Sequence, residues 1–311
     1  MRGCILLAFG ILSSVALAFL PRREHVATQH RPPDVHPEYQ SSSSWRCKQY
    51  GIISSQHRAS LDRKYDGEAP VTNDAAVVTG VTLKMAFDSS NAWGVADLSE
   101  TKPERFTSSE SLGMVHRLRR ESCAVLVGRG TVEKDDCTLT VRRVALGDGK
   151  RQPVRVVIDP SLSLIDGNYS LLNDGLQTII YHLQTNSPVV SPNEHVILVG
   201  LEPSEGEFDG TSFISPTAVV KDLDDRGFRH IMVEGGPATA RAFLKSGVVD
   251  RAILVRAPIE FEKPMPAMMN ERTLELAGLE MIGTAVFGSD RVEYWTRNGM
   301  VWPNEKLQMW P

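Results

Sequence analysis

Short apolar runs bounded by glycine, proline or polar residues recur along the second two-thirds of the chain and predict buried strands. Segments in which apolar residues return every three or four positions separate several of these runs and predict helices. The predicted strands cover residues 77–87, 123–128, 154–159, 178–183, 195–200, 230–233 and 251–259. Because strands that alternate with helices pair in parallel, we expect a layered α/β domain with a mostly parallel sheet.

Local start and turn signals refine this pattern. The helices are predicted to begin at Thr107, which can form a capping box with Glu110, at Ser215, where Pro216 takes the first helical position, and at Pro237. The last two apolar segments meet at Gly288-Ser289, a pair typical of a tight hairpin turn. The sheet is therefore expected to end in an antiparallel C-terminal hairpin.

The N-terminus is predicted to be an address rather than part of the fold. Residues 1–18 contain one arginine, an apolar run and small residues, in the order typical of a signal peptide. Residues 19–70 begin with Phe19 and are at first basic, rich in serine and proline and poor in acids, which resembles the transit segment of an algal bipartite plastid presequence. We expect these residues to be removed or unpacked, and the body, residues 71–311, to reach the plastid stroma. Secretion is the alternative, and the apolar run is too short to favour a membrane anchor.

Charge and cysteine usage exclude several classes of function. The 311 residues carry a formal net charge of −4, and residues 61–311 hold 27 Lys and Arg against 35 Asp and Glu. A body this acidic argues against nucleic-acid or membrane-surface binding, and it contains no long apolar span. Cys47, Cys123 and Cys137 have no short spacing, so neither a disulfide framework nor a metal site is expected.

Two junctions between a predicted strand and glycines are candidates for anion binding. Glu234 stands between an apolar strand and Gly235-Gly236, where a helix N-terminus and bare backbone N–H groups suit a phosphate. The same residues could simply form a tight turn. Gly128-Arg129-Gly130-Thr131 follows another strand and predicts a backbone nest with a guanidinium. The polar loop that follows it could equally be only a solvated surface.

Lys84 is the third candidate, because a lysine inside an apolar strand is costly unless its ammonium reaches a partner or a ligand. Its alternative is a side chain that extends to solvent from the end of the strand.

Four stretches carry a resemblance to a known family. In chain order they are VTLKMAF, FTSSESLGMVHRLRRESCAVLVGRGTVEKDDCTLTVR, QPVRVVID and VEGGPATARAFLKSGVVDRAILVRAPI. Together they resemble the reductase domain of riboflavin biosynthesis over residues 78–297, the C-terminal half of a bifunctional deaminase–reductase. The resemblance implies a dihydrofolate-reductase-like three-layer α/β/α fold, a homodimer, and NADPH-dependent reduction of a phosphoribosylaminopyrimidine to its ribitylamino form. The zinc-ligand set of the deaminase is not found in the sequence, so the resemblance is to a stand-alone reductase or to one whose deaminase motifs were lost, and a separate deaminase of the same pathway is a candidate partner.

The resemblance also assigns roles to individual residues. Lys84 and Glu234 match the family's charged pair at the pyrimidine and ribose of the substrate. The remaining substrate-binding positions are Arg119, Asp136, Leu139 and Arg142, with the arginines suited to the 5′-phosphate. The cofactor-binding positions are Arg129, Thr131, Asp135, Asp159, Gly235, Gly236, Pro237, Ala238 and Thr239. Within this set, Arg129 is expected to meet the adenosine 2′-phosphate.

The chain departs from the family pattern at a few further positions near these residues. Phe87 replaces a small residue expected near the nicotinamide, Ser90 stands where the family has the Asp of an Asp-Gly turn, Cys137 replaces a loop proline, and Pro160 replaces a serine. Two alternatives therefore stay open. One is a dihydrofolate-reductase-like enzyme with another substrate, and the other is a degenerate homologue kept for binding or regulation.

Overall fold

The structure, a computed structural model, describes residues 78–100, 105–184, 190–205 and 212–311. The expected signal peptide (1–18) and transit segment (19–70) lie outside the described residues, so both stay predictions. Two of the elements, α1 (Ser109–Glu121) and β3 (Ala124–Gly128), are separated by only two residues. The other helices are α2 (Arg129–Asp135), α3 (Ser170–Asn173), α4 (Pro216–Asp225), α5 (Pro237–Lys245), α6 (Glu271–Leu276) and the 3-10 turn η3 (Leu307–Met309).

A single mixed sheet forms the centre of the fold. Its nine strands run in the order β12-β13-β10-β1-β9-β3-β4-β5-β6. Their bounds are β1 (Gly80–Phe87), β4 (Val154–Ile158), β5 (Thr178–Leu183), β6 (Val196–Leu201), β9 (His230–Val233), β10 (Arg251–Arg256), β12 (Leu279–Phe287) and β13 (Asp290–Arg297). The strands from β10 to β6 pair in parallel, and β12 and β13 form the antiparallel edge. Small two-stranded pairs join β2 (Gly94–Asp97) to β11 (Pro264–Pro266) and β7 (Ser204–Glu205) to β8 (Ser212–Phe213).

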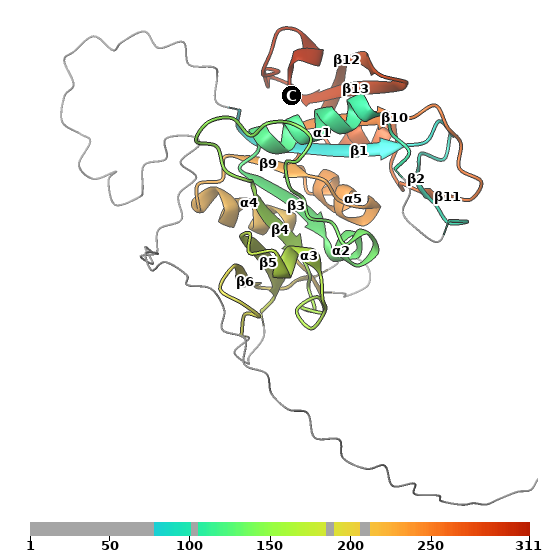
Figure 1. The fold of residues 1–311 in the computed structure, drawn as a ribbon. Helices are drawn as coiled ribbons and strands as arrows, with labels where there is room; N and C mark the ends of the chain where they lie inside the picture. The colour runs from blue at the N-terminus through green and yellow to red at the C-terminus, as the bar shows by residue number, and fades with distance from the viewer. Residues whose placement is uncertain (1–77, 101–104, 185–189, 206–211) are drawn as a thin grey trace, which may run out of the picture. The chain divides into compact units, whose positions relative to one another are not determined.

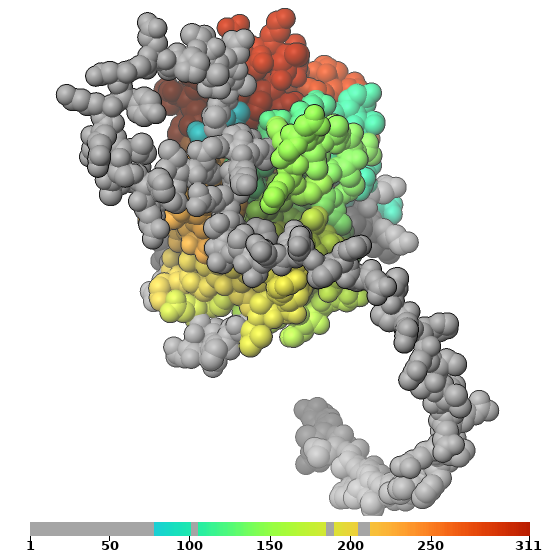
Figure 2. Space-filling view, turned by 60° about the vertical axis from the view of Figure 1, so that its left-hand side comes forward, coloured from blue at the N-terminus to red at the C-terminus, as the bar shows by residue number. Residues whose placement is uncertain are grey.

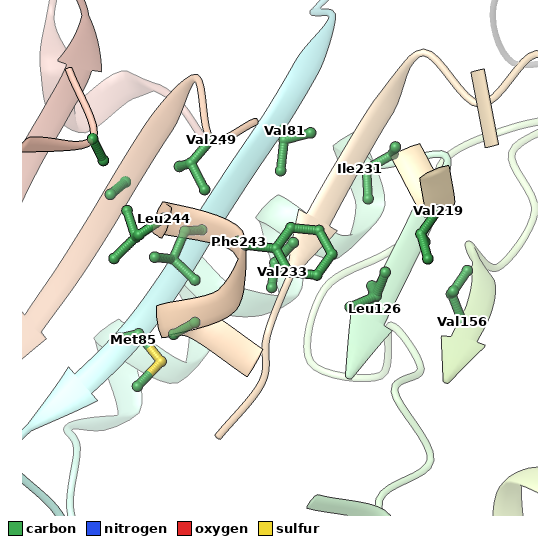
Figure 3. Close-up of a cluster of buried hydrophobic side chains, with 14 of the residues drawn as sticks. Val81, Met85, Leu126, Val156, Val219, Ile231, Val233, Phe243, Leu244 and Val249 are labelled. Carbon is green, nitrogen blue, oxygen red and sulfur yellow. The ribbon is translucent and has the colours of Figure 1, made fainter. Parts of the chain in front are cut away.

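Helices cover both faces of this sheet (Figure 1). One core cluster joins α4, α5 and α6 to one face, and a second joins α1, α2 and α3 to the other. Phe243 of α5 is fully buried and lies over Val81, Ile231 and Val233 of neighbouring strands (Figure 3). The expected three-layer α/β/α architecture is therefore confirmed. The red C-terminal residues and the yellow β6 region lie far apart in space, at opposite edges of the sheet, as the strand order requires (Figure 2).

Most of the predicted elements are present, with differences at their ends. Helix α1 is capped by Ser108, whose hydroxyl accepts a hydrogen bond from the Ser111 N–H, so the capping box expected at Thr107 is wrong by one residue. Ser215 takes the N-cap position of α4 without a side-chain cap. The open backbone nest predicted after Gly128 is also wrong, because residues 129–135 form the helix α2.

The C-terminal tail contributes to the core in a way that the sequence pattern did not predict. Trp302 and Trp310 are buried in the cluster under α1, with ring centroids 5.1 Å apart. Arg117 of α1 donates a hydrogen bond to the Pro311 carbonyl at 3.0 Å. The tail thus fixes α1 against the sheet. In the described part of the chain, every helix is too short or too polar to cross a lipid bilayer.

A buried histidine makes the fold sensitive to acid. Nδ1 of His230 lies 2.9 Å from the Glu121 carbonyl, and Nε2 lies 3.0 Å from the Thr82 hydroxyl. Nδ1 must therefore carry the proton of a neutral ring, with Nε2 as the acceptor. Burial lowers the pKa of His230 to about 4, because a charged ring at this position would be desolvated.

We expect the free energy of unfolding to fall as the pH drops from about 6.5 toward 4. Over this range the unfolded state takes up a proton on His230 that the folded state refuses, which costs on the order of 3 kcal/mol at the acid end. Denaturant titrations between pH 7 and pH 4 measure the loss. His230→Gln keeps a donor and an acceptor without the titration, so its acid slope should be shallower. Equal slopes in the two proteins would contradict this assignment.

Candidate functional site

The carboxyl ends of the parallel strands meet at one edge of the sheet, where open α/β folds bind their ligands. The register of β1 and β9 pairs Leu83 with Val233, and one further step places Glu234 beside Lys84. Their neighbours Leu83 and Val233 belong to the core on the α5 side. Because side chains alternate along a strand, Lys84 and Glu234 both face α1. The two isolated charges expected to form a pair therefore come from adjacent strands.

A bidentate ion pair joins the site to α1. Nε and Nη2 of Arg119 each donate to one Glu234 oxygen at 2.8 Å, and the two side chains are only 9% and 19% exposed. Nη1 of Arg119 donates to the Thr140 carbonyl at 2.9 Å. Burial opposes the charge on Glu234, but Arg119 and Lys84 outweigh it and hold its pKa below the usual value. Glu234 is therefore an anion, and it already has a partner before any ligand binds.

Lys84 lies in the same electrostatic network. Burial lowers the pKa of its ammonium, and the positive charge of Arg119 lowers it further, whereas Glu234 and Asp290 oppose the change. A lysine with a lowered pKa releases its proton more readily than an exposed one, which suits a general acid. The alternative of a solvated strand-end lysine is not what the structure has.

Cations gather beside this pair, in the loop between α2 and β4. Burial lowers the pKa of the Arg142 guanidinium, and so do the positive charges of Arg119, Arg105 and Arg143. The side chain of Arg142 is exposed and bonds to the Thr138 hydroxyl at 2.9 Å. Cationic side chains that repel one another at an open loop are suited to a dianion such as a phosphate ester.

On the other side of Glu234, two helix N-termini point toward the edge of the sheet. The N-caps of α2 and α5 are Gly128 and Gly236, and neither supplies a side chain to cap its helix. The Thr131 hydroxyl accepts a hydrogen bond from the Gly236 N–H at 3.2 Å, which joins the two junctions. The first N–H groups of the nine-residue helix α5 are thus left for a ligand.

Two of the junction glycines have a packing role as well. A Cβ at Gly235 would lie 2.8 Å from the Thr239 Cβ, and a Cβ at Gly128 would overlap the Thr239 hydroxyl. Gly130 has no neighbour that a Cβ would meet within 4 Å. The glycines therefore allow α5 to approach β3 closely, so the tight-turn alternative explains part of the motif.

Arg129 projects toward the turn that follows β4. Its Nη1 donates to the Ser161 hydroxyl at 2.8 Å and lies 3.4 Å from that of Ser163. Glu133 and the buried Asp159 lie near the same guanidinium, at 3.4 and 3.9 Å. One arginine and two exposed hydroxyls form a group of donors, next to carboxylates that compete for it.

Two other expected residues, Asp136 and Asp159, have structural partners. Asp136 accepts hydrogen bonds from the N–H and hydroxyl of Ser170, both at 2.7 Å, and so anchors the start of α3. Asp159 is fully buried and accepts from the Leu164 N–H at 2.9 Å. The residue Leu139 is only 2% exposed, and it packs in the core cluster on the α1 side of the sheet. Partial desolvation of the carboxyl group raises the pKa of Asp135, although the residue as a whole is exposed.

The residues that depart from the family pattern lie in different parts of the structure. Phe87 shares the α5-side core with Leu83 and stacks on Trp93, with ring centroids 5.1 Å apart. It is therefore on the opposite face of β1 from Lys84 and away from the charged site, and its expected place near the nicotinamide stays a prediction. Asp88 replaces the expected turn chemistry by binding the N–H and hydroxyl of Ser90. The Pro160 carbonyl accepts a hydrogen bond from Leu183 and remains part of the turn after β4.

Sequence reasoning missed His116, Gln152, Ser161 and Ser163. Ser161 and Ser163 follow β4 at the carboxyl edge of the sheet, whereas Gln152 precedes β4 and, with His116, binds the loop that carries Arg142. His116 lies one helical turn before Arg119 on α1, a spacing that could have pointed to it. No local pattern singles out the other three.

The fold is that of a dihydrofolate-reductase-like α/β domain, and its charged residues gather at the carboxyl edge of the sheet, where such folds bind their ligands. The family model described as the RibD C-terminal domain matches residues 93–285. The chain therefore belongs to the RibD C-terminal domain family.

Curated relatives agree with this family. The riboflavin biosynthesis protein RibD of Aquifex aeolicus is 37% identical over 152 residues, which cover 49% of this chain and 39% of that protein. The chain thus spans about two fifths of the length of that relative. The 2,5-diamino-6-ribosylamino-4(3H)-pyrimidinone 5′-phosphate reductase of Methanothermobacter thermautotrophicus is 33% identical over 159 residues, covering 51% of this chain and 70% of that protein.

Solved structures share the fold. The deaminase/5-amino-6-(5-phosphoribosylamino)uracil reductase of Thermotoga maritima superposes with a TM-score of 0.55 at 22% identity, covering 70% of this chain and 56% of that chain. A riboflavin biosynthesis reductase of Saccharomyces cerevisiae gives a TM-score of 0.50 at 17% identity, covering 72% and 92%.

The close approach of α5 to β3 can be tested by adding a methyl group. Gly128→Ala should lower the free energy of unfolding by roughly 1 to 3 kcal/mol, because the new Cβ overlaps the Thr239 hydroxyl. Thr239→Ala in the same chain should restore most of the loss. Gly130→Ala is the matched control and should be neutral or stabilising, because this position is open and helical. Equal losses from both alanines, measured by denaturant titration, would refute the packing argument.

Proposed function

We propose that this protein reduces 5-amino-6-(5-phosphoribosylamino)uracil, or its diaminopyrimidinone analogue, to the ribitylamino form with NADPH, as a step of riboflavin biosynthesis. The observation that carries the proposal is the position of Lys84 and Glu234, side by side between a group of arginines and two uncapped helix N-termini. Relatives named for this reduction support it. The cationic loop suits the substrate's phosphate, and the glycine junctions suit a second phosphate ligand.

The chain's own residues can provide the substrate chemistry. Once the ribose has opened to an imine, reduction adds a hydride to C1′ and a proton to the imine nitrogen. Lys84 would donate this proton, because the lowered pKa of its ammonium favours release. Glu234 is held in one orientation by Arg119 and can accept hydrogen bonds from the pyrimidine or from ribose hydroxyls.

The loop beside Arg119 suits the 5′-phosphate. Arg142 is exposed there, and its interactions in the structure are with hydroxyls rather than carboxylates. A phosphate would neutralise the repulsion between the arginines.

The second half of the cleft fits a nicotinamide dinucleotide. The uncapped N-terminus of α5 suits a pyrophosphate, and Gly236 leaves the backbone open to it. Arg129, with Ser161 and Ser163, suits the extra 2′-phosphate that distinguishes NADPH from NADH. Thr131 joins the two junctions and Asp135 lies at the end of α2, both within this half of the site. When bound, NADPH would supply the hydride.

Two partners belong to the proposal. A homodimer of the reductase is expected from the family resemblance, and a separate deaminase would act on the same pathway intermediates.

Two open hollows on the described surface, of about 590 Å³ beside Leu244 and Met268 and about 330 Å³ beside Trp93, include none of the residues proposed to bind substrate or cofactor.

Cofactor oxidation with two purified pyrimidines tests the proposed function. We expect the protein to oxidise NADPH with the deaminated or the non-deaminated phosphoribosylaminopyrimidine, and the better of the two identifies the position of the step. Binding of NADPH without turnover of either compound would favour a degenerate binding homologue. Turnover of dihydrofolate or another acceptor alone would favour the second enzyme class.

Cofactor preference tests Arg129. Arg129→Ala should reduce the preference for NADPH over NADH by roughly tenfold or more, because a charge-assisted contact to the 2′-phosphate is worth about 1.4 kcal/mol or more. Titration of both cofactors into wild type and variant gives the ratio. Arg155 is not a candidate for the same task, because it is 1% exposed and bonded to the Leu171 carbonyl. An unchanged ratio would show that Arg129 is not the discriminating residue.

A further inference from the structure

The loop that carries Arg142 is held in an unusual way. Residues 136–143 form neither helix nor strand, and Leu139 has a φ of +54°, a conformation that non-glycine residues rarely adopt. A loop without regular hydrogen bonds is ordinarily mobile. Here side chains from outside the loop bind its backbone instead.

Gln152 pairs with the loop as a strand would. Its Oε1 accepts from the Val141 N–H at 2.7 Å, and its Nε2 donates to the Val141 carbonyl at 3.0 Å. One side-chain amide thus satisfies both backbone groups of a buried residue. Gln152 lies two residues before β4, so this contact fastens the loop to the central sheet.

Helix α1 holds the loop on either side of Val141. Nδ1 of His116 accepts a hydrogen bond from the Arg142 N–H at 3.1 Å, and Arg119 donates to the Thr140 carbonyl. His116 and Arg119 are three residues apart and so share one face of α1. The His116 side chain is buried, and burial together with the neighbouring arginines lowers its pKa to about 4, so the ring is neutral and able to accept.

The charges in the loop explain why such a clamp is needed. Arg142 feels the positive charge of Arg119, Arg105 and Arg143, and repulsion between them favours a loop that moves away from α1. The hydrogen bonds of the Arg142 side chain go to the neutral hydroxyls of Thr138 and Thr140, and the charge of Glu234 offsets only part of the repulsion. The backbone clamp acts against it before any anion arrives.

We propose that His116 and Gln152 are positioning residues that hold residues 140–142 against α1 and β4, so that Arg142 is in place for the phosphate ester of the substrate. Neither side chain touches the reacting atoms. The identity of the ester rests on the proposed function, whereas the clamp itself rests on the hydrogen bonds. Losing it should weaken the binding of phosphate esters and leave the binding of the cofactor as it is.

Matched variants of the full chain separate positioning from bulk. His116→Phe keeps a ring but removes the acceptor, whereas His116→Asn can place an oxygen near the position of Nδ1. Gln152→Glu is isosteric but replaces the donor to the Val141 carbonyl with an oxygen. The probes are ribose 5-phosphate, ribose and NADPH, each titrated by calorimetry, followed by steady-state kinetics with the better pyrimidine and its dephosphorylated form.

We expect His116→Phe and Gln152→Glu to weaken ribose 5-phosphate binding about tenfold, the factor that corresponds to one lost hydrogen bond. His116→Asn should retain most of the affinity, and all three variants should bind NADPH as wild type does. In kinetics the KM for the phosphorylated pyrimidine should rise more than kcat falls, and the KM for the dephosphorylated form should not change. Melting temperatures identify a variant that fails to fold, in which case the other variant decides.

The outcomes separate this inference from the proposed function. Wild-type turnover with unchanged phosphate-ester binding in both disruptive variants overturns the clamp and leaves the reductase. Loss of ribose 5-phosphate binding in the variants of a protein that turns over neither pyrimidine supports the clamp and overturns the reductase. A wild-type protein that binds no phosphate ester overturns the clamp, and so does an Asn variant as weak as the Phe variant.

Discussion

The bidentate ion pair between Arg119 and Glu234 lies between the cationic loop after α2 and the glycine junction before α5. Taking both charges out of water is costly, and only two short, parallel hydrogen bonds with further support make such a pair favourable. Here Lys84 and the Thr140 carbonyl provide the support. Because Arg119 belongs to α1 and Glu234 follows β9, the pair also fixes the helix on the sheet.

This constraint divides the cleft into two regions of different character. On the side of α1, cationic side chains are carried by a loop whose backbone is bound by other side chains. On the side of α5, the helix N-terminus and backbone groups are positioned by glycines that let Thr239 pack closely. Both regions present groups that suit anions although the chain as a whole is acidic, which supports the proposed phosphate-bearing ligands.

The sequence predicted the sheet well because its signals are local. Short apolar runs predicted the parallel strands, and the turn at Gly288 predicted the hairpin. Lys84 and Glu234 could be found because each is a lone charge next to an apolar run. Their pairing depends on strand order, which no local pattern encodes. The clamp by Gln152 and the burial of Trp310 under α1 depend on distant contacts and were missed for the same reason. The side of β1 on which Phe87 lies could have been predicted, because residues three apart on a strand face opposite ways.

The central claim is that Lys84 acts on the substrate and not on the fold or the cofactor, whereas Glu234 also holds α1 on the sheet through Arg119. Single-turnover measurement of NADPH oxidation tests it most directly, with wild type, Lys84→Met and Glu234→Gln each saturated with cofactor and the phosphorylated pyrimidine. The account predicts that Lys84→Met slows the hydride-transfer step by about a hundredfold or more, the usual contribution of a positioned proton donor, while cofactor affinity and melting temperature stay near wild type. A Lys84→Met protein that transfers hydride at the wild-type rate would contradict it.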